Sequence, residues 1–229
     1  MCGRYTLRDI DRAREYLKEL RVTETSLDLL DRWRPRYNIA PSQQVLAVRA
    51  SEDHGQLELV SLRWGLLPRW SKERTLKYNT INAKVERVDT APAYRASFRD
   101  RRALILADGL YEWQRPAKTP YYIHLTDHAV FAFAGLWDRW ADRVTGEVIE
   151  SCSIIVGPPN ELIRPIHDRL AVILPREHYD RWIDPQVTRA KDLKSLLQPY
   201  PSEAMAAYPV SRHVNRPAND DPQCVVPLE

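Results

Sequence analysis

The second residue of the chain carries the most distinctive chemistry. Cys2 follows Met1, and its small side chain permits aminopeptidases to remove that methionine. Removal leaves a thiol and a free α-amino group on adjacent carbons, which together form a 1,2-aminothiol. This pair attacks an aldehyde twice, through nitrogen to give an imine and then through sulfur to close a thiazolidine ring. The α-amino group has a reference pKa of about 7.7–8.0, against about 10.4 for lysine, so far more of it is neutral near pH 7.

Three further polar residues are candidates for moving or holding protons in such a reaction. Glu112 follows the apolar run 103–107, His167 precedes the run 170–174, and Asn82 lies in a short polar segment. Glu112 can accept a proton from the amine and return one to the departing water, if burial raises its pKa. His167 titrates in the range needed to give or take a proton near neutral pH. Asn82 can hold the amine without titrating.

Each of these residues also has an ordinary structural interpretation. A cysteine can fall at position 2 without any chemical role. Glu112 can pair with Arg115, His167 can bond to Asp168, and Asn82 can serve a turn. The types and positions of these residues indicate chemistry only when they are taken together.

The stretch 64–102 is rich in both cations and aromatic rings. Cations neutralise phosphates and exposed rings stack on bases, so this composition favours single-stranded nucleic acid as a partner. Acidic residues in the same stretch leave open a solvated face of mixed charge, and the net charge of +3 favours an anionic partner only weakly. The cations are Arg69, Lys72, Arg74, Lys77, Lys84, Arg87, Arg95, Arg99, Arg101 and Arg102, and the rings are Trp64, Trp70, Tyr78, Tyr94 and Phe98.

Composition excludes several classes of protein. The chain has 229 residues and no run of about 18 apolar residues, so we expect one domain over 1–229 and no membrane span. Arginines at positions 4, 8 and 12 interrupt any signal-peptide core. Three scattered cysteines form neither a disulfide framework nor a zinc motif, and the six histidines lack ligand spacing. We therefore expect a cytoplasmic monomer, associated with the nucleoid when bound to DNA, without a metal ion or organic cofactor.

The elements that must position these residues are mostly strands. Apolar spacing predicts a helix from Leu7 to Leu20 with Thr6 as its N-cap, and a loop over 33–38. Strands without regularly alternating long helices favour an α+β fold, with a mainly antiparallel sheet curled into an open barrel and flanked by short helices. The expected strands are 45–49, 57–64, 103–107, 121–125, 130–136, 152–156 and 170–174; the short helices are 160–164, 176–182 and 190–197, with Asn160 and Thr188 as caps.

Seven motifs in order along the chain resemble the SRAP family, the SOS response-associated peptidases that process abasic sites. The motifs are MCGRY at the N-terminus, YNIAPSQ at 37–43, WGLLPRW at 64–70, INAKVE at 81–86, DGLYEW at 108–113, PIHDR at 165–169 and PVSRHVN at 209–215. Each motif alone is weak, but seven in register with a cysteine at position 2 are specific and span nearly the whole chain.

The resemblance implies an activity and a set of residues. Family members bind single-stranded DNA and crosslink to the aldehyde of an abasic site through the N-terminal cysteine. The resemblance also implies peptidase activity that removes Met1, and lyase-type chemistry. It implies catalytic roles for Cys2, Asn82, Glu112 and His167. It implies DNA contacts at Arg4, Pro41, Trp70, Lys84, Trp113, Arg169 and Ser211.

Two departures from the family pattern concern the predicted DNA contacts. Lys84 stands where the family usually has arginine, so the planar bidentate fork is lost while the charge is kept. Gly157 lies in a stretch that usually carries threonine. Two other functions stay open at this point: a cysteine peptidase with Cys2 as nucleophile and His167 as base, and a noncatalytic RNA-binding module.

Overall fold

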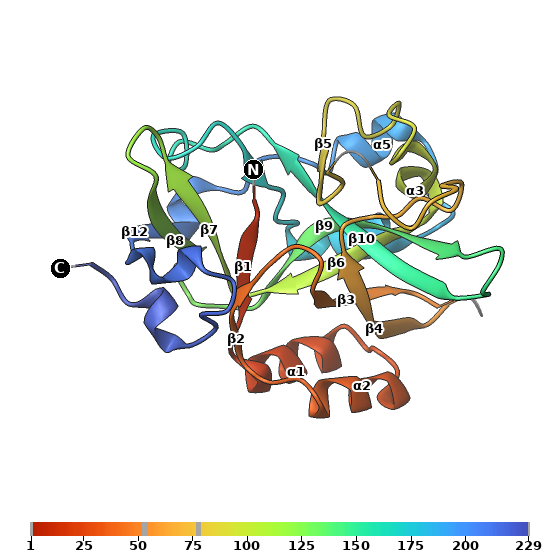
Figure 1. Cartoon of the computed structure of the whole chain (residues 1–229), viewed down its shortest axis with the longest axis horizontal. Helices are drawn as coiled ribbons and strands as arrows, with labels where there is room; N and C mark the ends of the chain where they lie inside the picture. The colour runs from red at the N-terminus through yellow and green to blue at the C-terminus, as the bar shows by residue number, and fades with distance from the viewer. Residues whose placement is uncertain (1, 52–54, 77–78, 229) are drawn as a thin grey trace.

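Five strands of the larger sheet close into a ring. The computed structural model describes residues 2–51, 55–76 and 79–228, so Met1 and the Lys77 and Tyr78 of the basic stretch lie outside it. The pairings run from strand to strand and return to the start, because β10 pairs both with β9 and with β4 (Figure 1). The ring strands are β3 (Gln44–Ala50), β4 (Leu57–Trp64), β6 (Arg102–Ala107), β9 (Phe131–Ala141) and β10 (Val148–Gly157).

Two short strands extend this ring along β10. β11 (Leu170–Ala171) pairs with it antiparallel, and β5 (Asn82–Lys84) pairs with it in parallel. Strand β6 is buried along its whole length, because helices cover the side that does not face the interior of the ring. This explains its apolar sequence from Ala103 to Ala107.

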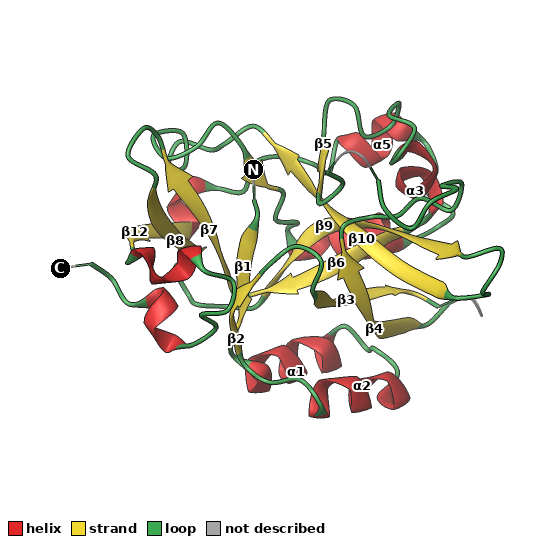
Figure 2. Ribbon diagram, in the orientation of Figure 1, coloured by secondary structure: helices red, strands yellow, loops and turns green. Residues whose placement is uncertain are grey.

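A second, five-stranded sheet carries the N-terminus. Its order is β12 (Met205–Pro209), β8 (Thr119–Leu125), β7 (Gly109–Gln114), β1 (Arg4–Leu7) and β2 (Arg36–Ile39), all antiparallel. Strand β1 lies between β7 and β2 (Figure 2). The start of the chain is therefore held on both sides by hydrogen-bonded neighbours.

Short helices surround the two sheets. The α-helices are α1 (Ile10–Glu19), α2 (Glu24–Asp31), α3 (Arg95–Asp100), α4 (Tyr179–Ile183) and α5 (Ala190–Lys194), and the 3-10 helices are η1 (Arg176–His178), η2 (Ser202–Ala204), η3 (Arg212–Asn215) and η4 (Pro222–Val225). Helix α2 packs on β4, and α3 and α4 pack on β6. None of the helices in the described ranges is long and apolar enough to cross a membrane.

The predicted α+β class and curled, mainly antiparallel sheet are confirmed, and the pairing of β9 with β10 closes the ring. Each of the seven predicted strands overlaps an observed strand. The strand predicted over 170–174 is short, because only Leu170–Ala171 forms a ladder and Ile173 makes a single bridge to Phe133.

Several local predictions were wrong. Thr6 belongs to β1 and bonds to Asp108, while Asp9 caps α1 by accepting from the Arg12 amide. The loop predicted over 33–38 contains the start of β2. These residues form a strand because they pair with β1.

One predicted helix and one predicted cap were also wrong. The segment predicted as a helix over 160–164 forms turns, although the Asn160 side chain accepts from the Ile163 amide as an N-cap does. The N-cap of α5 is Arg189 rather than Thr188.

Candidate active site

Strand pairing brings Cys2 and Glu112 together. Strand β1 runs antiparallel to β7 with Arg4 opposite Tyr111, so residues before Arg4 lie beside residues after Tyr111. The Cys2 side chain is fully buried, and its thiol donates to the carbonyl of Arg4 at 3.8 Å. Burial raises the pKa of this thiol far above its usual value, and the nearby Glu112 carboxylate raises it further. The thiol is therefore uncharged at neutral pH.

Glu112 is a buried carboxyl group with an unusual affinity for protons. Glu112 is only 1% exposed, and this burial raises the pKa of its carboxyl group to about 7. A carboxyl group with this pKa exists in both protonation states near neutral pH. It can therefore accept and return a proton without large cost in either direction.

His167 lies beside Glu112, with 3.9 Å between its Nδ1 and the Glu112 Oε2. Burial lowers the pKa of its imidazole. Nδ1 lies 3.0 Å from the backbone amide of Arg169 and 3.2 Å from its carbonyl, so the residues after His167 can fix the ring in either tautomer. Nδ1 also lies 3.2 Å from the Asp168 carboxylate, a contact that is favourable when Nδ1 carries a proton.

Asn82 carries a buried amide that the rest of the described chain does not bind. Neither its Oδ1 nor its Nδ2 has a hydrogen-bond partner within the described ranges. Its backbone is fixed, because β5 pairs with β10 and the Tyr94 hydroxyl donates to the Asn82 carbonyl at 3.0 Å. Burying a side-chain amide without partners costs free energy, so such a group is a candidate for binding a ligand.

Arg4 is held by residues 210–228, which form the C-terminal segment of the described chain. Its Nη1 donates to the Asn38 Oδ1 at 2.8 Å and to the Val214 carbonyl at 2.7 Å, while Nη2 donates to the Asn215 carbonyl at 3.3 Å. The Asn38 amide in turn donates to three carbonyls of the same segment, those of Val214, Arg216 and Asn219. These contacts fix β1 two residues beyond Cys2.

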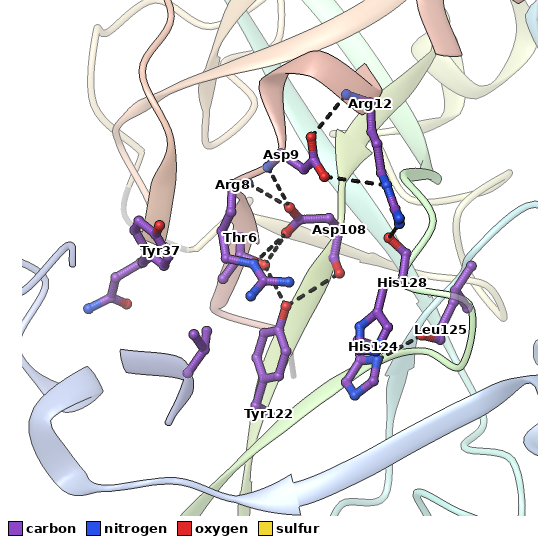
Figure 3. Close-up of polar contacts among 12 residues, drawn as sticks. Thr6, Arg8, Asp9, Arg12, Tyr37, Asp108, Tyr122, His124, Leu125 and His128 are labelled. Atoms are coloured by element: carbon purple, nitrogen blue, oxygen red, sulfur yellow. Dashed lines mark hydrogen bonds and ion pairs between the residues drawn. The ribbon is translucent and has the colours of Figure 1, made fainter. Parts of the chain in front are cut away.

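A buried carboxylate anchors the other end of β1 (Figure 3). Asp108 accepts from the Thr6 hydroxyl and from the backbone amides of Arg8 at 2.6 Å and Asp9 at 3.0 Å. The Tyr122 hydroxyl of β8 lies 3.1 Å from the Thr6 hydroxyl. The turn from β1 into α1 is thereby tied to β7 and β8, and Cys2 is placed by a strand held at both ends.

The predicted DNA-contacting residues differ in how available they are. Lys84 is exposed at the end of β5, and Trp70 is 50% exposed with its Nε1 donating to the Pro92 carbonyl at 3.2 Å. Arg169 is half-buried and forms an ion pair with Glu86. Lys84 and Trp70 therefore have the greatest freedom to meet a nucleic acid.

Three other predicted contacts have defined places in the protein. Pro41 lies half-buried in the turn after β2. The Trp113 Nε1 donates to the Asn215 Oδ1 at 2.8 Å. Ser211 caps η3 by accepting from the His213 amide. The roles of all these residues toward DNA stay predictions.

Two site-building residues were missed in the sequence. Asn38 and Asp108 each lie within a motif, YNIAPSQ and DGLYEW respectively. Both are buried polar residues beside strand ends, and that pattern was the available signal.

Comparison with known proteins identifies the family of this chain. The profile of the SOS response associated peptidase (SRAP) family matches residues 1–217. The chain belongs to the SRAP family. It is 38% identical to the abasic site processing protein YoqW of Bacillus subtilis over 98% of this chain and 99% of that protein. It is 31% identical to the abasic site processing protein HMCES of Xenopus tropicalis, over 86% of this chain and 68% of that protein.

Solved structures share the SRAP fold of this chain. A protein from Bacteroides thetaiotaomicron superposes with a TM-score of 0.84 over the whole of both chains, at 24% identity. A phage-related protein from Bordetella bronchiseptica gives a TM-score of 0.68 at 31% identity, over 91% of this chain and 94% of that chain.

Proposed function

We propose that this protein captures abasic sites in single-stranded DNA by a covalent thiazolidine bond to Cys2, after removal of Met1. The observation that carries the proposal is the buried Cys2 thiol next to Glu112, whose pKa is raised to about 7. The names of the relatives, abasic site processing proteins, support the same substrate.

The reaction balances as a condensation that releases one water. The α-amine of Cys2 adds to the aldehyde carbon of the ring-opened sugar to give a carbinolamine. Loss of its hydroxyl as water gives an imine, and the Cys2 sulfur then bonds to the same carbon. The thiol proton moves to the nitrogen as the ring closes. No oxidant or cofactor is consumed.

Glu112 and His167 divide the proton transfers. Glu112 takes a proton from the amine as nitrogen attacks and returns it to the departing hydroxyl, a role suited to its raised pKa. His167, in the protonated form of its imidazole, gives a proton to the sugar ring oxygen and recovers one from the anomeric hydroxyl as the hemiacetal opens. Asn82 offers an amide without partners in the described chain, which can hold the amine or the sugar.

The buried thiol sets the order of bond formation. Because burial keeps the Cys2 thiol protonated, sulfur is a poor first nucleophile. Nitrogen therefore attacks first, and sulfur follows once the electrophilic imine is held beside it.

DNA binding before the reaction involves three of the predicted contact residues. Lys84 supplies a positive charge for a phosphate, and the half-exposed ring of Trp70 offers a face for base stacking. Arg169 contributes a second cation once DNA phosphate competes with Glu86 for its guanidinium. We propose that the protein acts as a monomer in the cytoplasm, on the DNA of the nucleoid.

Peptidase activity toward Met1 forms part of the proposal, since the aminothiol exists only after Met1 is lost. A general cysteine peptidase is a weaker alternative, because the Cys2 thiol donates to the Arg4 carbonyl rather than to an imidazole. Lyase chemistry at the imine is an expected side reaction, because an imine acidifies the adjacent carbon and favours elimination of the DNA 3′ phosphate.

The deciding experiment compares two oligonucleotides by intact mass. One carries a natural abasic site, and the other carries tetrahydrofuran, which has no aldehyde. The processed protein should gain the mass of the first oligonucleotide less one water and should not react with the second. A variant that keeps one residue before Cys2 has the nitrogen of Cys2 in a peptide bond and should not react. Formation of the product by that variant would overturn the proposal.

A further inference from the structure

Three metal-binding side chains come together in the C-terminal segment, away from the reaction described above. They are His213 of η3, Asp221 at the N-cap of η4, and Cys224 within η4. One ligand atom from each lies within 4.8 Å of the other two. The His213 Nε2 is 2.9 Å from the Asp221 Oδ2. From this geometry we infer that His213, Asp221 and Cys224 bind a zinc ion.

The donor set and its dimensions suit Zn²⁺. Zinc takes imidazole nitrogen and carboxylate oxygen at about 2.0–2.2 Å and thiolate sulfur at about 2.3 Å, which places neighbouring donors roughly 3.4–3.6 Å apart in a tetrahedron. The side chains of His213 and Asp221 are 37% and 45% exposed, so both can make the small rotations required. A thiolate among the donors favours zinc over magnesium or calcium. Water fills the fourth position, and the Cys224 thiol proton leaves to solvent.

Surrounding groups hold two of the ligands in position. The Asp221 Oδ1 accepts from the Gln223 amide at 2.9 Å, which leaves Oδ2 for the metal. The Asn219 side-chain nitrogen lies 3.1 Å from the His213 Nδ1 and donates to the His213 carbonyl at 2.7 Å. When Nε2 binds zinc, Nδ1 must carry a proton, so the ring rotation that brings Nε2 to the metal must also move Nδ1 off the Asn219 nitrogen, while the bond to the His213 carbonyl stays.

The segment that would carry this metal is tied to β1 and β2 by polar contacts, including those of Arg4 and Asn38 and those of Asp220, whose Oδ1 accepts from the Tyr37 and Asn38 backbone amides. It contains two 3-10 helices and a single bridge between Val210 and Pro227. Its apolar contacts form a small cluster separate from the main core, which includes Val214 and Cys224. A metal joining η3 to η4 supplies the crosslink that such a small core lacks.

Zinc binding at this site also affects the residues that hold the candidate active site. The carbonyls of Val214 and Asn215, directly after His213, receive the Arg4 guanidinium. Zinc fixing His213 therefore steadies the acceptors that hold β1 next to Cys2. The site acts on structure, and the binding of zinc does not depend on the proposed reaction with DNA.

The test uses the tag-free full chain in a Cys2→Ala background, because the Cys2 aminothiol is itself a chelator. The protein is stripped with EDTA and then titrated with Co²⁺ as a spectroscopic probe. It should bind one equivalent with a thiolate-to-cobalt charge-transfer band in the near ultraviolet, and Zn²⁺ should bleach that band. After dialysis with Zn²⁺, elemental analysis should find one equivalent retained.

Matched variants locate the site. Cys224→Ser should abolish the charge-transfer band, and Asp221→Asn, at a half-exposed position, should weaken metal binding while the chain stays folded. Cys152→Ser removes the other remaining thiol and should leave the band unchanged. Absence of one-to-one binding, or a band that survives Cys224→Ser, would overturn the inference. Zn²⁺ should also raise the melting temperature of the Cys2→Ala protein but not that of its Cys224→Ser derivative.

Discussion

The Nδ1 of His167 lies 3.9 Å from the Oε2 of Glu112, and both side chains are almost fully buried. The same burial moves their pKa values in opposite directions, upward for the carboxyl group and downward for the imidazole. Near neutral pH Glu112 therefore exists in both protonation states, whereas His167 gives a proton from the minor, protonated form of its imidazole. A site that must both open a sugar ring and expel water from a carbinolamine needs two such donors.

The roles of His167 and Glu112 should be distinguishable by the choice of substrate. His167→Ala should crosslink slowly to a natural abasic site but recover much of its rate on an analogue locked as the open aldehyde, which needs no ring opening. Glu112→Gln should be slow on both, because loss of water is common to them, and its crosslink should reverse slowly. Single-turnover rates of the two variants on the two substrates measure this. Equal defects of His167→Ala on both would assign His167 a structural role.

The raised pKa of Glu112 predicts how stability depends on pH. The folded protein binds the Glu112 proton up to about pH 7, whereas an unfolded glutamate releases it near 4.5, so this residue costs stability as pH rises through that window. Glu112→Gln removes the cost. The variant should match the wild type near pH 4 and exceed it at pH 8 by up to about 3 kcal/mol. Urea unfolding at the two pH values tests this, and an equal difference at both would mean that Glu112 does not titrate there.

Lys84 should account for part of the salt dependence of DNA binding. Lys84→Ala should flatten the plot of log K against log salt by about 0.7, the value for one phosphate contact on a single strand. Lys84→Arg should bind at least as well as wild type, because the guanidinium restores a bidentate fork. Lys18→Ala, on the exposed face of α1, serves as the control for net charge. The assignment fails if Lys84→Ala and Lys18→Ala change the slope equally.

Asn38 should couple the C-terminal segment to Arg4. Asn38→Ala removes the donor to the carbonyls of Val214, Arg216 and Asn219 and one acceptor of Arg4, and should destabilise the fold by about 1–3 kcal/mol. Asn38→Asp keeps the size but turns a carboxylate toward those carbonyls, so it should be at least as unstable. Denaturant unfolding measures both, and wild-type stability in Asn38→Asp would show that the amide donor is unimportant.

The sequence predicted the ring strands well because their apolar runs are long and buried. Strand β1 was missed because Arg4–Leu7 is four residues long and becomes a strand only by pairing with β7 and β2. The same limit applies to the site. Cys2, Glu112 and His167 were predicted by their chemistry. Arg4, in contrast, bonds to Val214 and Asn215, which lie 210 and 211 positions later in the chain. Such contacts depend on tertiary packing, which no local sequence pattern records.

The measurement that bears most directly on the central claim is the product formed by Cys2 variants with abasic single-stranded DNA. The wild type should give a crosslink that survives heat without reductant. Cys2→Ser should give at most an imine that borohydride traps, and Cys2→Ala should give no heat-stable product. Tandem mass spectrometry of the wild-type product should place the DNA remnant on Cys2 with both nitrogen and sulfur bonded to one carbon. A heat-stable crosslink of normal yield in Cys2→Ala, formed without borohydride, would contradict the account.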